Sequence, residues 1–383
     1  MRRSSSDRAG VYVRQRGGYG AFIPKNLPPD PPIKIDREIL TLLSQAEREL
    51  GRLDGSTEIL PNPDLFVFMY VRKEAVLSSQ IEGTQASLID VLEFEAHALK
   101  AGRPKDVQEV ANYVAAMNYG LDRLKNLPLS LRLIREIHAK LLEGVRGTRR
   151  NPGEFRRSQN WIGPSGATLA SAIYVPPPPY EMGIALDNLE KFLHDKTFTP
   201  FLIKVGIAHA QFETIHPFLD GNGRIGRLLI TFLLCQENIL KRPLLYLSHY
   251  FRLHRDEYYD RLQAIRDTGN WEGWLKFYLR GVSEVSQQAT ETARRIVQMR
   301  EDHRQMVTDR MAGGAGKALT LLESLYWMPI VSVKEIVKIT SLSFPNANNI
   351  AQRFLEMNLL REMTGQKRNR RFIYDPYFNL FPT

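Results

Sequence analysis

Apolar residues recur at helical spacing along most of this 383-residue chain. From Asp36 onward they are three and four positions apart, as at Ile39 and Leu43, which predicts an amphipathic helix. Asn62 and Pro63 then place a capping residue and a first-turn proline ahead of another apolar run. The fold class expected is therefore mainly α. Three further helices are predicted to begin after side chains able to cap them, Ser87, Asp106 and Ser130. Helical spacing then resumes from Tyr180 to about Gln298.

Some stretches interrupt this pattern. Residues 157–179 alternate β-branched or aromatic residues with Gly-Pro-Ser-Gly turn chemistry, which predicts a hairpin or flap. The first thirty-five residues lack apolar periodicity and are rich in Ser, Gly, Arg and Pro. Gly-rich "RMAGGAGKALT" precedes a change to short helices and a basic, alternating tail. The expected organisation is a mobile basic and Pro-rich arm (1–35), an N-terminal helical region (36–125), a helical core (126–298) with its flap (157–179), a linker (299–316) and a small C-terminal domain (317–383).

Composition narrows the classes of protein. The chain carries 52 Lys and Arg against 42 Asp and Glu, a net charge of +10, which favours a polyanionic partner such as a nucleotide or nucleic acid. Its single cysteine, Cys235, lies in an apolar run and is expected to be a buried small hydrophobe. No apolar run is long enough to cross a bilayer, and no apolar stretch follows the Arg-rich start as in a signal peptide. We expect a cytoplasmic protein without a membrane partner.

The stretch "HPFLDGNGRIGRLLI" carries candidate chemistry. Its glycines immediately precede a run that strongly predicts a helix, so unsatisfied backbone N–H groups would face the glycine loop. Such a loop can cradle a phosphate, because glycine lets an anion approach the backbone closely. Arg224 and Arg227 lie one turn apart at the start of the helix, where they would clamp further phosphate oxygens.

Two further residues of the stretch add a metal ligand and a base. Asp220 offers a hard oxygen to Mg²⁺, which usually binds through one or two carboxylates together with phosphates and water. His216 could accept a proton from a nucleophile that attacks the phosphate. Taken singly, a histidine is more often structural and Asp-Gly-Asn-Gly is more often a turn. The combination at this spacing favours a nucleotide site.

This stretch resembles the signature of the Fic (Fido) family, H-P-F-x-[D/E]-G-N-G-R-x-x-R, at every specified position from His216 to Arg227. The resemblance extends over roughly Asp36 to Gln298. It implies transfer of AMP from ATP to a Tyr, Ser or Thr hydroxyl of a protein target, or of the protein itself, with His216 as general base and Asp220 as the Mg²⁺ ligand. The implied nucleotide contacts are Gly221, Asn222, Gly223, Arg224 and Arg227 around the phosphates, and Tyr258 and Tyr259 beside the adenine, although tyrosines on an amphipathic helix are by default core residues.

The predicted flap also resembles the family's target-positioning segment. An extended target would pair with it as an added strand, so the backbone of the flap would matter more than its side chains. The residues implied for this role are Ile162, Gly163 and Tyr174.

A second motif, "SSQIEGTQ", ends the helix that begins at Pro63. Ser78 and Glu82 lie four residues apart on one face, and Gly83 is a predicted C-cap. A carboxylate at a helix C-terminus is unfavourable with respect to the helix dipole, which suggests a cationic partner elsewhere. The motif resembles the family's inhibitory sequence, [S/T]-x-x-x-E-[G/N], which implies that Glu82 pairs with Arg227, takes part in nucleotide binding and keeps the resting protein inactive.

Several alternatives stay open. In some members of this family the same glutamate aligns a water that removes AMP, so the enzyme could be de-AMPylating or bifunctional. A nucleotide-sensing, DNA-binding regulator and a transferase of a whole phosphoryl group are further alternatives. A homodimer that covers or frees the helix from Pro63 would be a natural regulator.

The C-terminal domain resembles a winged helix-turn-helix. Three short helices are predicted after Gly316, followed by a hairpin with a basic tip. Such domains bind DNA or dock partners, and the sequence leaves both open. The candidate DNA contacts are Arg353, beside Asn346, Asn348 and Asn349 on the third helix, and Lys367, Arg368, Arg370 and Arg371 on the wing.

Overall fold

The computed structural model describes residues 8–56, 63–96, 106–145, 150–164, 166–198, 200–311, 313–366 and 368–381. It is mainly helical, as the sequence predicts. Asn62, the expected cap of the second helix, lies outside the described residues. The core helices are α1 (Arg37–Ser56), α2 (Pro63–Ile81), α3 (Leu88–Glu95), α4 (Val107–Arg123), α5 (Leu131–Leu141), α6 (Pro179–His194), α7 (Phe201–Ile215), α8 (Asn222–Gln236), α9 (Ser248–Leu253), α10 (Arg255–Thr268) and α11 (Trp271–Arg310).

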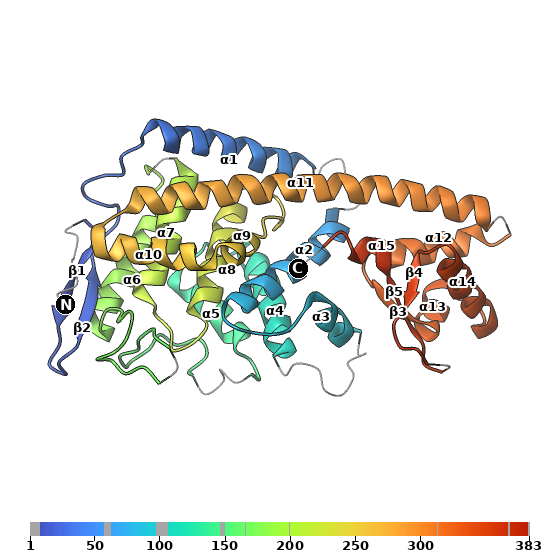
Figure 1. Ribbon diagram of the computed structural model, residues 1–383, viewed down its shortest axis with the longest axis horizontal. Coiled ribbons are helices and arrows are strands. Elements are labelled where there is room, and N and C mark those ends of the chain that lie inside the picture. Colours follow the sequence, from blue (N-terminus) through green and yellow to red (C-terminus); the bar gives the residue numbers. More distant parts are fainter. Residues whose placement is uncertain are drawn as a thin grey trace.

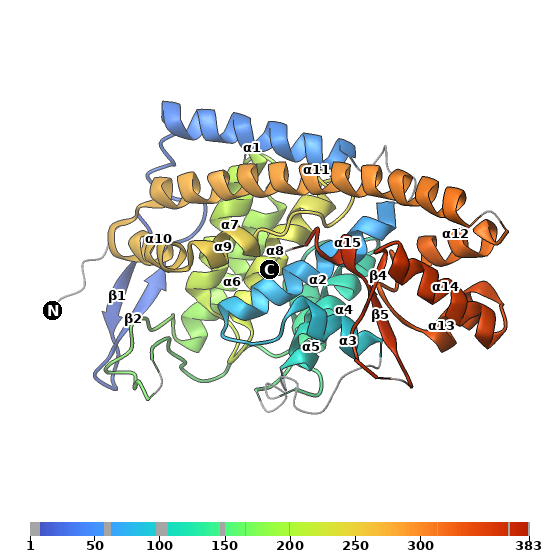
Figure 2. The ribbon, with the colours of Figure 1, turned by 45° about the vertical axis from the view of Figure 1, so that its right-hand side comes forward.

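Helices α7 and α8 form the centre of the molecule. All residues of α7 from Leu202 to Ile215 are buried, the polar Lys204, His209 and Glu213 among them, so the helix runs through the interior. Helix α11 crosses the core, and α1 lies along it in both ribbon views (Figures 1 and 2). The loop between α7 and α8 carries the glycine-rich motif, so this packed centre fixes the position of the motif.

The predicted helix starts are partly confirmed. Ser87 forms a capping box with Asp90, and the Ser130 hydroxyl accepts a hydrogen bond from the Leu133 N–H. Asp106 makes no capping hydrogen bond to its own helix; its carboxylate instead accepts one from the Gln85 N–H at 2.6 Å. The expected Asp106 cap is therefore wrong, because the carboxylate faces the segment that follows α2.

The N-terminal segment differs from the mobile arm expected. Strands β1 (Gly10–Arg14) and β2 (Gly20–Pro24) form an antiparallel hairpin. Phe22 is fully buried, and its N–H donates to the Val175 carbonyl at 2.9 Å. The Arg8 guanidinium pairs with Glu272 at 2.7 Å. The physical reason is that the short runs flanking the glycines have enough aromatic and β-branched residues to add to the core.

The junction with the C-terminal module also differs from expectation. Residues 299–310, expected in a linker, continue α11 without a break, and Val307 and Met311 are buried. The stretch holds no proline or glycine until Gly313, so nothing ends the helix earlier.

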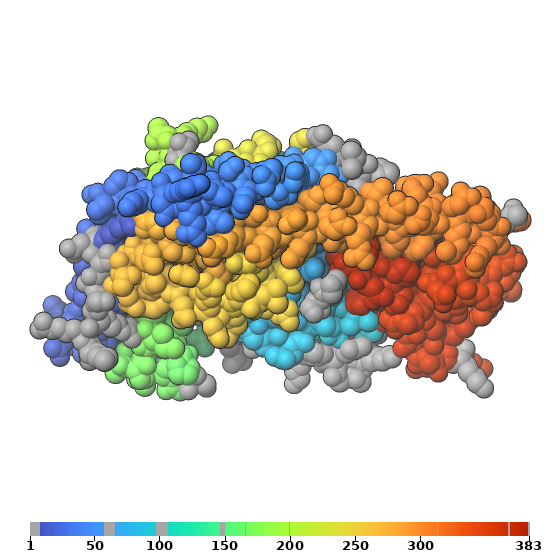
Figure 3. Space-filling model, turned by 45° about the horizontal axis from the view of Figure 1, so that its top comes forward, coloured from blue at the N-terminus to red at the C-terminus, as the bar shows by residue number. Residues whose placement is uncertain are grey.

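The C-terminal module contains α12 (Ala315–Ser324), α13 (Val333–Thr340), α14 (Phe344–Glu356) and α15 (Asp375–Phe378). Strands β3 (Ile330–Ser332), β4 (Leu360–Glu362) and β5 (Arg371–Tyr374) form an antiparallel sheet in the order β3-β5-β4. The Tyr374 hydroxyl lies 2.6 Å from the His303 ring on α11, which joins the module to the core. The module forms a lobe at one end of the molecule (Figure 3). Among the described helices, none has a stretch apolar enough to span a bilayer.

Candidate functional site

The glycine-rich motif forms a tightly braced turn between α7 and α8. His216 ends α7 in the left-handed region with φ of 50°, and Gly221 has φ of 77° just before α8. The Asn222 side chain accepts from the Phe218 N–H and donates to the Phe218 carbonyl, both at 2.8 Å. Asn222 is thus a brace of the loop, and only its backbone N–H is available to an anion. This N–H, with those of Gly223 and Arg224, belongs to the first turn of the helix and lacks an intrahelical acceptor.

The environment of His216 keeps its imidazole neutral. Burial, together with the nearby Arg266 and Arg156 cations, lowers the pKa of His216 to about 4. Within the described residues, its buried Nδ1 atom has no hydrogen-bond partner. A neutral ring at physiological pH can accept a proton, as a general base must.

Arg156 is a structural residue of the site that the sequence did not reveal. Its guanidinium is 1% exposed and donates to the carbonyls of His216 at 3.0 Å, Ser158 at 3.1 Å and Pro177. Asn160 also donates to the Phe218 carbonyl at 2.9 Å. These side chains join the base of the flap to the start of the motif. The contact of Arg156 with His216 spans sixty positions of sequence, so the local pattern could not have revealed it.

His138 braces the other side of the loop. The Gly153 N–H donates to Nδ1 of His138 at 2.9 Å, which leaves the proton on Nε2 to be donated to the Asp220 carbonyl at 3.0 Å. Its ring stacks on Phe218 with centroids 3.7 Å apart, and burial lowers its pKa to about 4. This histidine therefore stays neutral and holds the backbone of the candidate metal ligand.

Arg227 joins the motif to the end of α2, as the family resemblance implies. Its Nε donates to the Ser78 hydroxyl at 2.8 Å, and its Nη2 donates to the Ser78 carbonyl at 2.9 Å and to Glu82 Oε1 at 2.7 Å. The Arg227 side chain is 2% exposed and the Glu82 side chain is 36% exposed. Burial alone would raise the pKa of Glu82, but the Arg227 charge lowers it overall. The two groups therefore form a charged pair.

Gly83 sets the position of Glu82. It adopts the left-handed conformation with φ of 93°, and its N–H donates to the Gln80 carbonyl at 3.0 Å. The Thr84 N–H donates to the Ser79 carbonyl at 3.2 Å. These two bonds and the left-handed residue make a Schellman motif, which confirms the predicted C-cap glycine. The turn directs the Glu82 carboxylate toward α8.

The Glu82 carboxylate lies against the N-terminus of α8. A Cβ atom at Gly223 would collide with Glu82 Oε1, and the Arg227 guanidinium would lie 3.0 Å away. Glycine at this position is thus required by the close approach of an anionic group to the backbone. In this conformation the anion is the protein's own carboxylate, at the place where helix geometry favours negative charge.

Arg224 faces partners of its own. It donates to Glu109 and to Asp220 Oδ1, each at 3.3 Å, and its side chain is 4% exposed. Arg224 and Arg227 therefore do not share one partner in this state, although they lie one turn apart. Asp220 Oδ1 also accepts from the Gly221 N–H at 2.6 Å, while 36% of the Asp220 side chain stays exposed. A single, partly exposed carboxylate beside the N-terminus of a helix has the chemistry of a Mg²⁺ ligand whose partners are phosphate and water.

Glu213 is a second carboxyl group near Arg227. It is 7% exposed, and burial raises its pKa to about 7. Its Oε1 atom has no hydrogen-bond partner among the described residues and lies against Gly226, where a Cβ atom would collide with it. Arg227 thus stands between two acidic groups, one exposed and one buried.

The two tyrosines proposed beside the adenine differ in their surroundings. Tyr258 is 1% exposed, its ring stacks on Phe251, and its hydroxyl lies 2.9 Å from Nε2 of His209. Its expected place at the adenine is wrong in this structure, because it is a core residue. Tyr259 is 40% exposed and lies under the Arg255 guanidinium at 5.2 Å. Only Tyr259 of the pair offers a ring face to a base.

Within the described residues of the flap, its two arms meet in one isolated bridge rather than in a regular hairpin. Ile162 and Tyr174 form an isolated antiparallel bridge, with the Ile162 N–H donating to the Tyr174 carbonyl at 2.8 Å. Tyr174 is 1% exposed, its hydroxyl donates to the Thr214 carbonyl at 2.6 Å, and Arg266 lies over its ring at 3.9 Å. It anchors the flap and cannot present its side chain to a target. Ile162 is 36% exposed, and Gly163 packs against Ala167.

The candidate DNA contacts are partly engaged within the C-terminal module. Lys367 lies outside the described residues. Arg353 and Arg368 are exposed. Arg370 donates to the Asn348 side chain at 2.7 Å, and Arg371 lies 3.8 Å from Glu335. The surface available to a phosphate backbone is therefore smaller than expected.

Comparison with known protein families gives two matches. Residues 40–122 match the Fic/DOC family N-terminal model, and residues 128–234 match the Fic/DOC family model. Together they contain the Ser78–Gly83 motif and the His216–Arg227 motif. In fold, the chain is similar to a Fic family protein from Desulfovibrio desulfuricans, with a TM-score of 0.57 and 19% identity over 90% of this chain and 97% of that one.

Curated relatives of the chain carry names that specify an activity. The chain is 32% identical over 187 residues to a protein named protein adenylyltransferase Fic from Aedes aegypti, covering 48% of this chain and 33% of that protein. It is 28% identical over 175 residues to a probable protein adenylyltransferase from Aquifex aeolicus, covering 46% of this chain and 51% of that protein. The matched region thus spans a third to a half of these relatives.

Proposed function

Because this chain belongs to the Fic/DOC family, we propose that it transfers AMP from ATP to a Tyr, Ser or Thr hydroxyl of a protein. The observation that carries the proposal is His216, partly buried and with a neutral imidazole, beside the N-terminus of α8. His216 takes the proton of the attacking hydroxyl, which is a poor nucleophile without a base. The N-terminal N–H groups of α8, together with Arg224 and Arg227, bind the phosphates.

Asp220 would hold Mg²⁺, which supplies charge neutralisation on the phosphates when bound. The brace formed by Asn222 and His138 keeps the loop backbone fixed, so the anion site is preorganised before ATP arrives. Tyr259 stacks against the adenine from α10. An extended target segment adds to the flap beside Ile162. ATP and a protein are therefore the partners we propose, in the cytoplasm.

We further propose that Glu82 keeps the resting protein inhibited. It occupies one side of the Arg227 guanidinium and lies against Gly223. A γ-phosphate needs the same guanidinium donors, so carboxylate and phosphate compete for one site. ATP that binds beside the closed pair lacks the Arg227 contact and is held out of line for transfer.

The test uses ATP labelled separately at the α- and γ-phosphates, with the native chain and the His216→Ala and Glu82→Gly variants, scoring self-modification first. Label from the α-phosphate on protein, lost in His216→Ala, supports AMP transfer. Label from the γ-phosphate indicates a kinase. A target that already carries AMP is incubated with the native chain or with Glu82→Gly. Loss of AMP with the native chain alone would mean that the enzyme removes AMP, the reverse of the reaction proposed.

A second proposal concerns the C-terminal module, which resembles a winged helix in the helices α12 to α14 and its three-stranded sheet. We propose that Arg353 and Arg368, both exposed, contact the phosphates of duplex DNA. Binding should then weaken steeply between low and moderate salt. Absent or salt-independent binding indicates a protein-docking module.

A further inference from the structure

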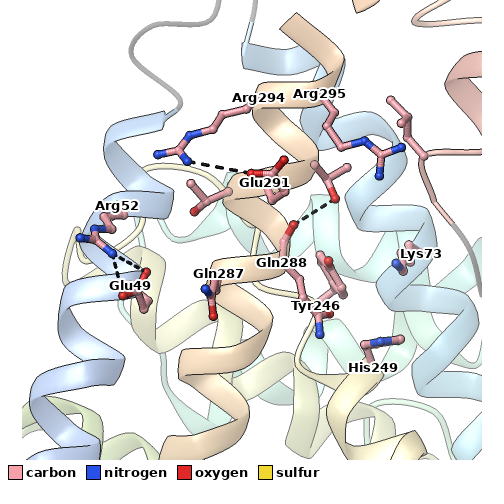
Figure 4. Close-up of a pocket in the computed structure, with 13 residues that line it drawn as sticks. Glu49, Arg52, Lys73, Tyr246, His249, Gln287, Gln288, Glu291, Arg294 and Arg295 are labelled. Atoms are coloured by element: carbon pink, nitrogen blue, oxygen red, sulfur yellow. Dashed lines mark hydrogen bonds and ion pairs between the residues drawn. The ribbon is translucent and has the colours of Figure 1, made fainter. Parts of the chain in front are cut away.

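A second cavity lies away from the motif, between α1, α2, α11 and the start of α9. It has a volume of about 500 Å³, which is in the range typical of small-molecule sites. None of its lining residues belongs to the His216–Arg227 motif. Figure 4 shows Lys73, His249 and Arg295 on one side of α11, and Glu49 and Arg52 on the other.

Lys73 is the central cation of this cavity. It is 5% exposed, and its ammonium lies 4.5 Å from the centroid of the Tyr246 ring. In the part of the chain that the structure describes, no carboxylate pairs with it. Burial of an unpaired cation is unfavourable, and here it lowers the pKa of Lys73 to about 8. An anion in the cavity would remove this cost.

The other charges of the cavity leave a positive excess next to Lys73. Arg52 already pairs with Glu49 at 2.9 Å, and Arg294 has Glu291 at 3.9 Å. Arg295 lines the cavity and pairs with no carboxylate in the described ranges. The carboxylates of Glu49 and Glu291 are thus neutralised by Arg52 and Arg294. Lys73 and Arg295 remain as the cations available to a bound anion.

His249 adds a hydrogen-bonding group to the same side. Its Nδ1 atom is buried and has no partner among the described residues. Its position relative to Lys73 is fixed, because Ser248 donates through its backbone N–H and its hydroxyl to Glu74. Glu74 follows Lys73 on α2, and Ser248 precedes His249 on α9. The cation and the imidazole are therefore held together before any ligand binds.

We propose that this cavity binds a small molecule that carries a phosphate group. A phosphate dianion balances the two remaining cations, and its several acceptor oxygens suit an ammonium, a guanidinium and an imidazole N–H together. The ring of Tyr246, which lines the cavity, offers an apolar surface to the part of the ligand that carries no phosphate. The site is separate from the ATP phosphate cradle, and it does not depend on the function proposed for that cradle.

The experiment is equilibrium dialysis of the full chain against radiolabelled inorganic phosphate at constant ionic strength. Lys73→Met should weaken binding at least tenfold without loss of thermal stability, since methionine is similar in length and uncharged. The exposed Arg295→Gln, which leaves the core intact, should weaken binding several-fold. The same Lys-to-Met exchange at the exposed Lys196 is the matched control and should change nothing.

Arg224→Gln distinguishes the two anion sites. It removes a cation of the ATP cradle and should leave phosphate binding in the second cavity intact. Phosphate binding that survives both Lys73→Met and Arg295→Gln, or that is lost in Arg224→Gln alone, would overturn the proposal. Neither of these results would bear on the proposal that the His216–Arg227 motif transfers AMP.

Discussion

Replacement of Glu82 by glycine tests the proposed competition between carboxylate and phosphate at Arg227. The substitution removes one charge-assisted hydrogen bond of 2.7 Å and leaves the two contacts from Arg227 to Ser78. Hydrogen bonds to charged groups contribute about 1.5–3 kcal/mol. Because the Glu82 side chain is 36% exposed, solvent screening places this pair near the lower end, at about 1.5–2 kcal/mol.

That free energy sets the size of the expected effect. About 1.4 kcal/mol corresponds to a factor of ten, so the fraction of molecules with an available Arg227 should rise by about 10- to 30-fold. The assay is the initial rate of AMP incorporation from α-labelled ATP, at a concentration below saturation. Glu82→Gln, which keeps the shape and removes the charge, should show a smaller rise in the same direction. Ser78→Ala leaves the ion pair in place and should change the rate least.

The same substitution predicts a change in stability. Arg227 loses the carboxylate of Glu82, which directly follows α2, and stays buried, so the free energy of unfolding should fall by about 1–2 kcal/mol. Saturating ATP should restore part of this loss, because phosphate replaces the carboxylate. The reasoning is refuted if Glu82→Gly binds ATP as well as the native chain does but transfers no more AMP.

Three further predictions follow from the same site. His216→Ala should lower the rate of AMP transfer by a factor of about 10²–10⁴, while the affinity for ATP, measured by calorimetry, stays within about twofold. A variant that keeps the native rate would exclude His216 as the base. Burial raises the pKa of Glu213 from 4.5 to about 7, so its ionisation costs native stability progressively as pH rises from about 4.5 through 7. Glu213→Gln should therefore gain up to about 3 kcal/mol over the native chain between pH 5 and pH 8 in urea unfolding, and a pH-independent difference would contradict this. Arg156→Lys should lower the free energy of unfolding by about 3 kcal/mol, because lysine cannot reach the same carbonyls, while Arg157→Lys next to it, with a side chain 86% exposed, should have no effect.

The sequence predicted those parts of the site that are continuous in the chain. The spacing from His216 to Arg227 fixes one turn and the start of one helix, and Ser78 to Gly83 fixes one helix end, so local rules suffice for both. The pairing of Glu82 with Arg227 followed from the family resemblance together with the charge of each group.

The braces were not predicted because their partners are distant in sequence. Arg156 contacts carbonyls about sixty residues away, and a single arginine in a loop carries no local signal of burial. Tyr258 and Tyr174 were assigned to the site but are buried in the core. An aromatic residue at helical or strand spacing can face either a ligand or the core, and spacing alone does not decide between them. The hairpin at Gly10–Pro24 was missed because its strands are short and surrounded by proline and glycine.

The unbroken course of α11 determines how the chain can be divided for experiment. At 40 residues the helix is about 60 Å long, and it carries core residues at its start and the contact to Tyr374 near its end. A fragment that stopped at residue 298 would cut this helix and expose apolar surface that the C-terminal module now covers. Fragments intended to fold should instead end close to Gly313 and Gly314, where the chain leaves the helix before α12 begins. Even then, the contact of Phe381 with Tyr70 on α2 would be lost, so the shorter protein would need its α2 surface tested for aggregation.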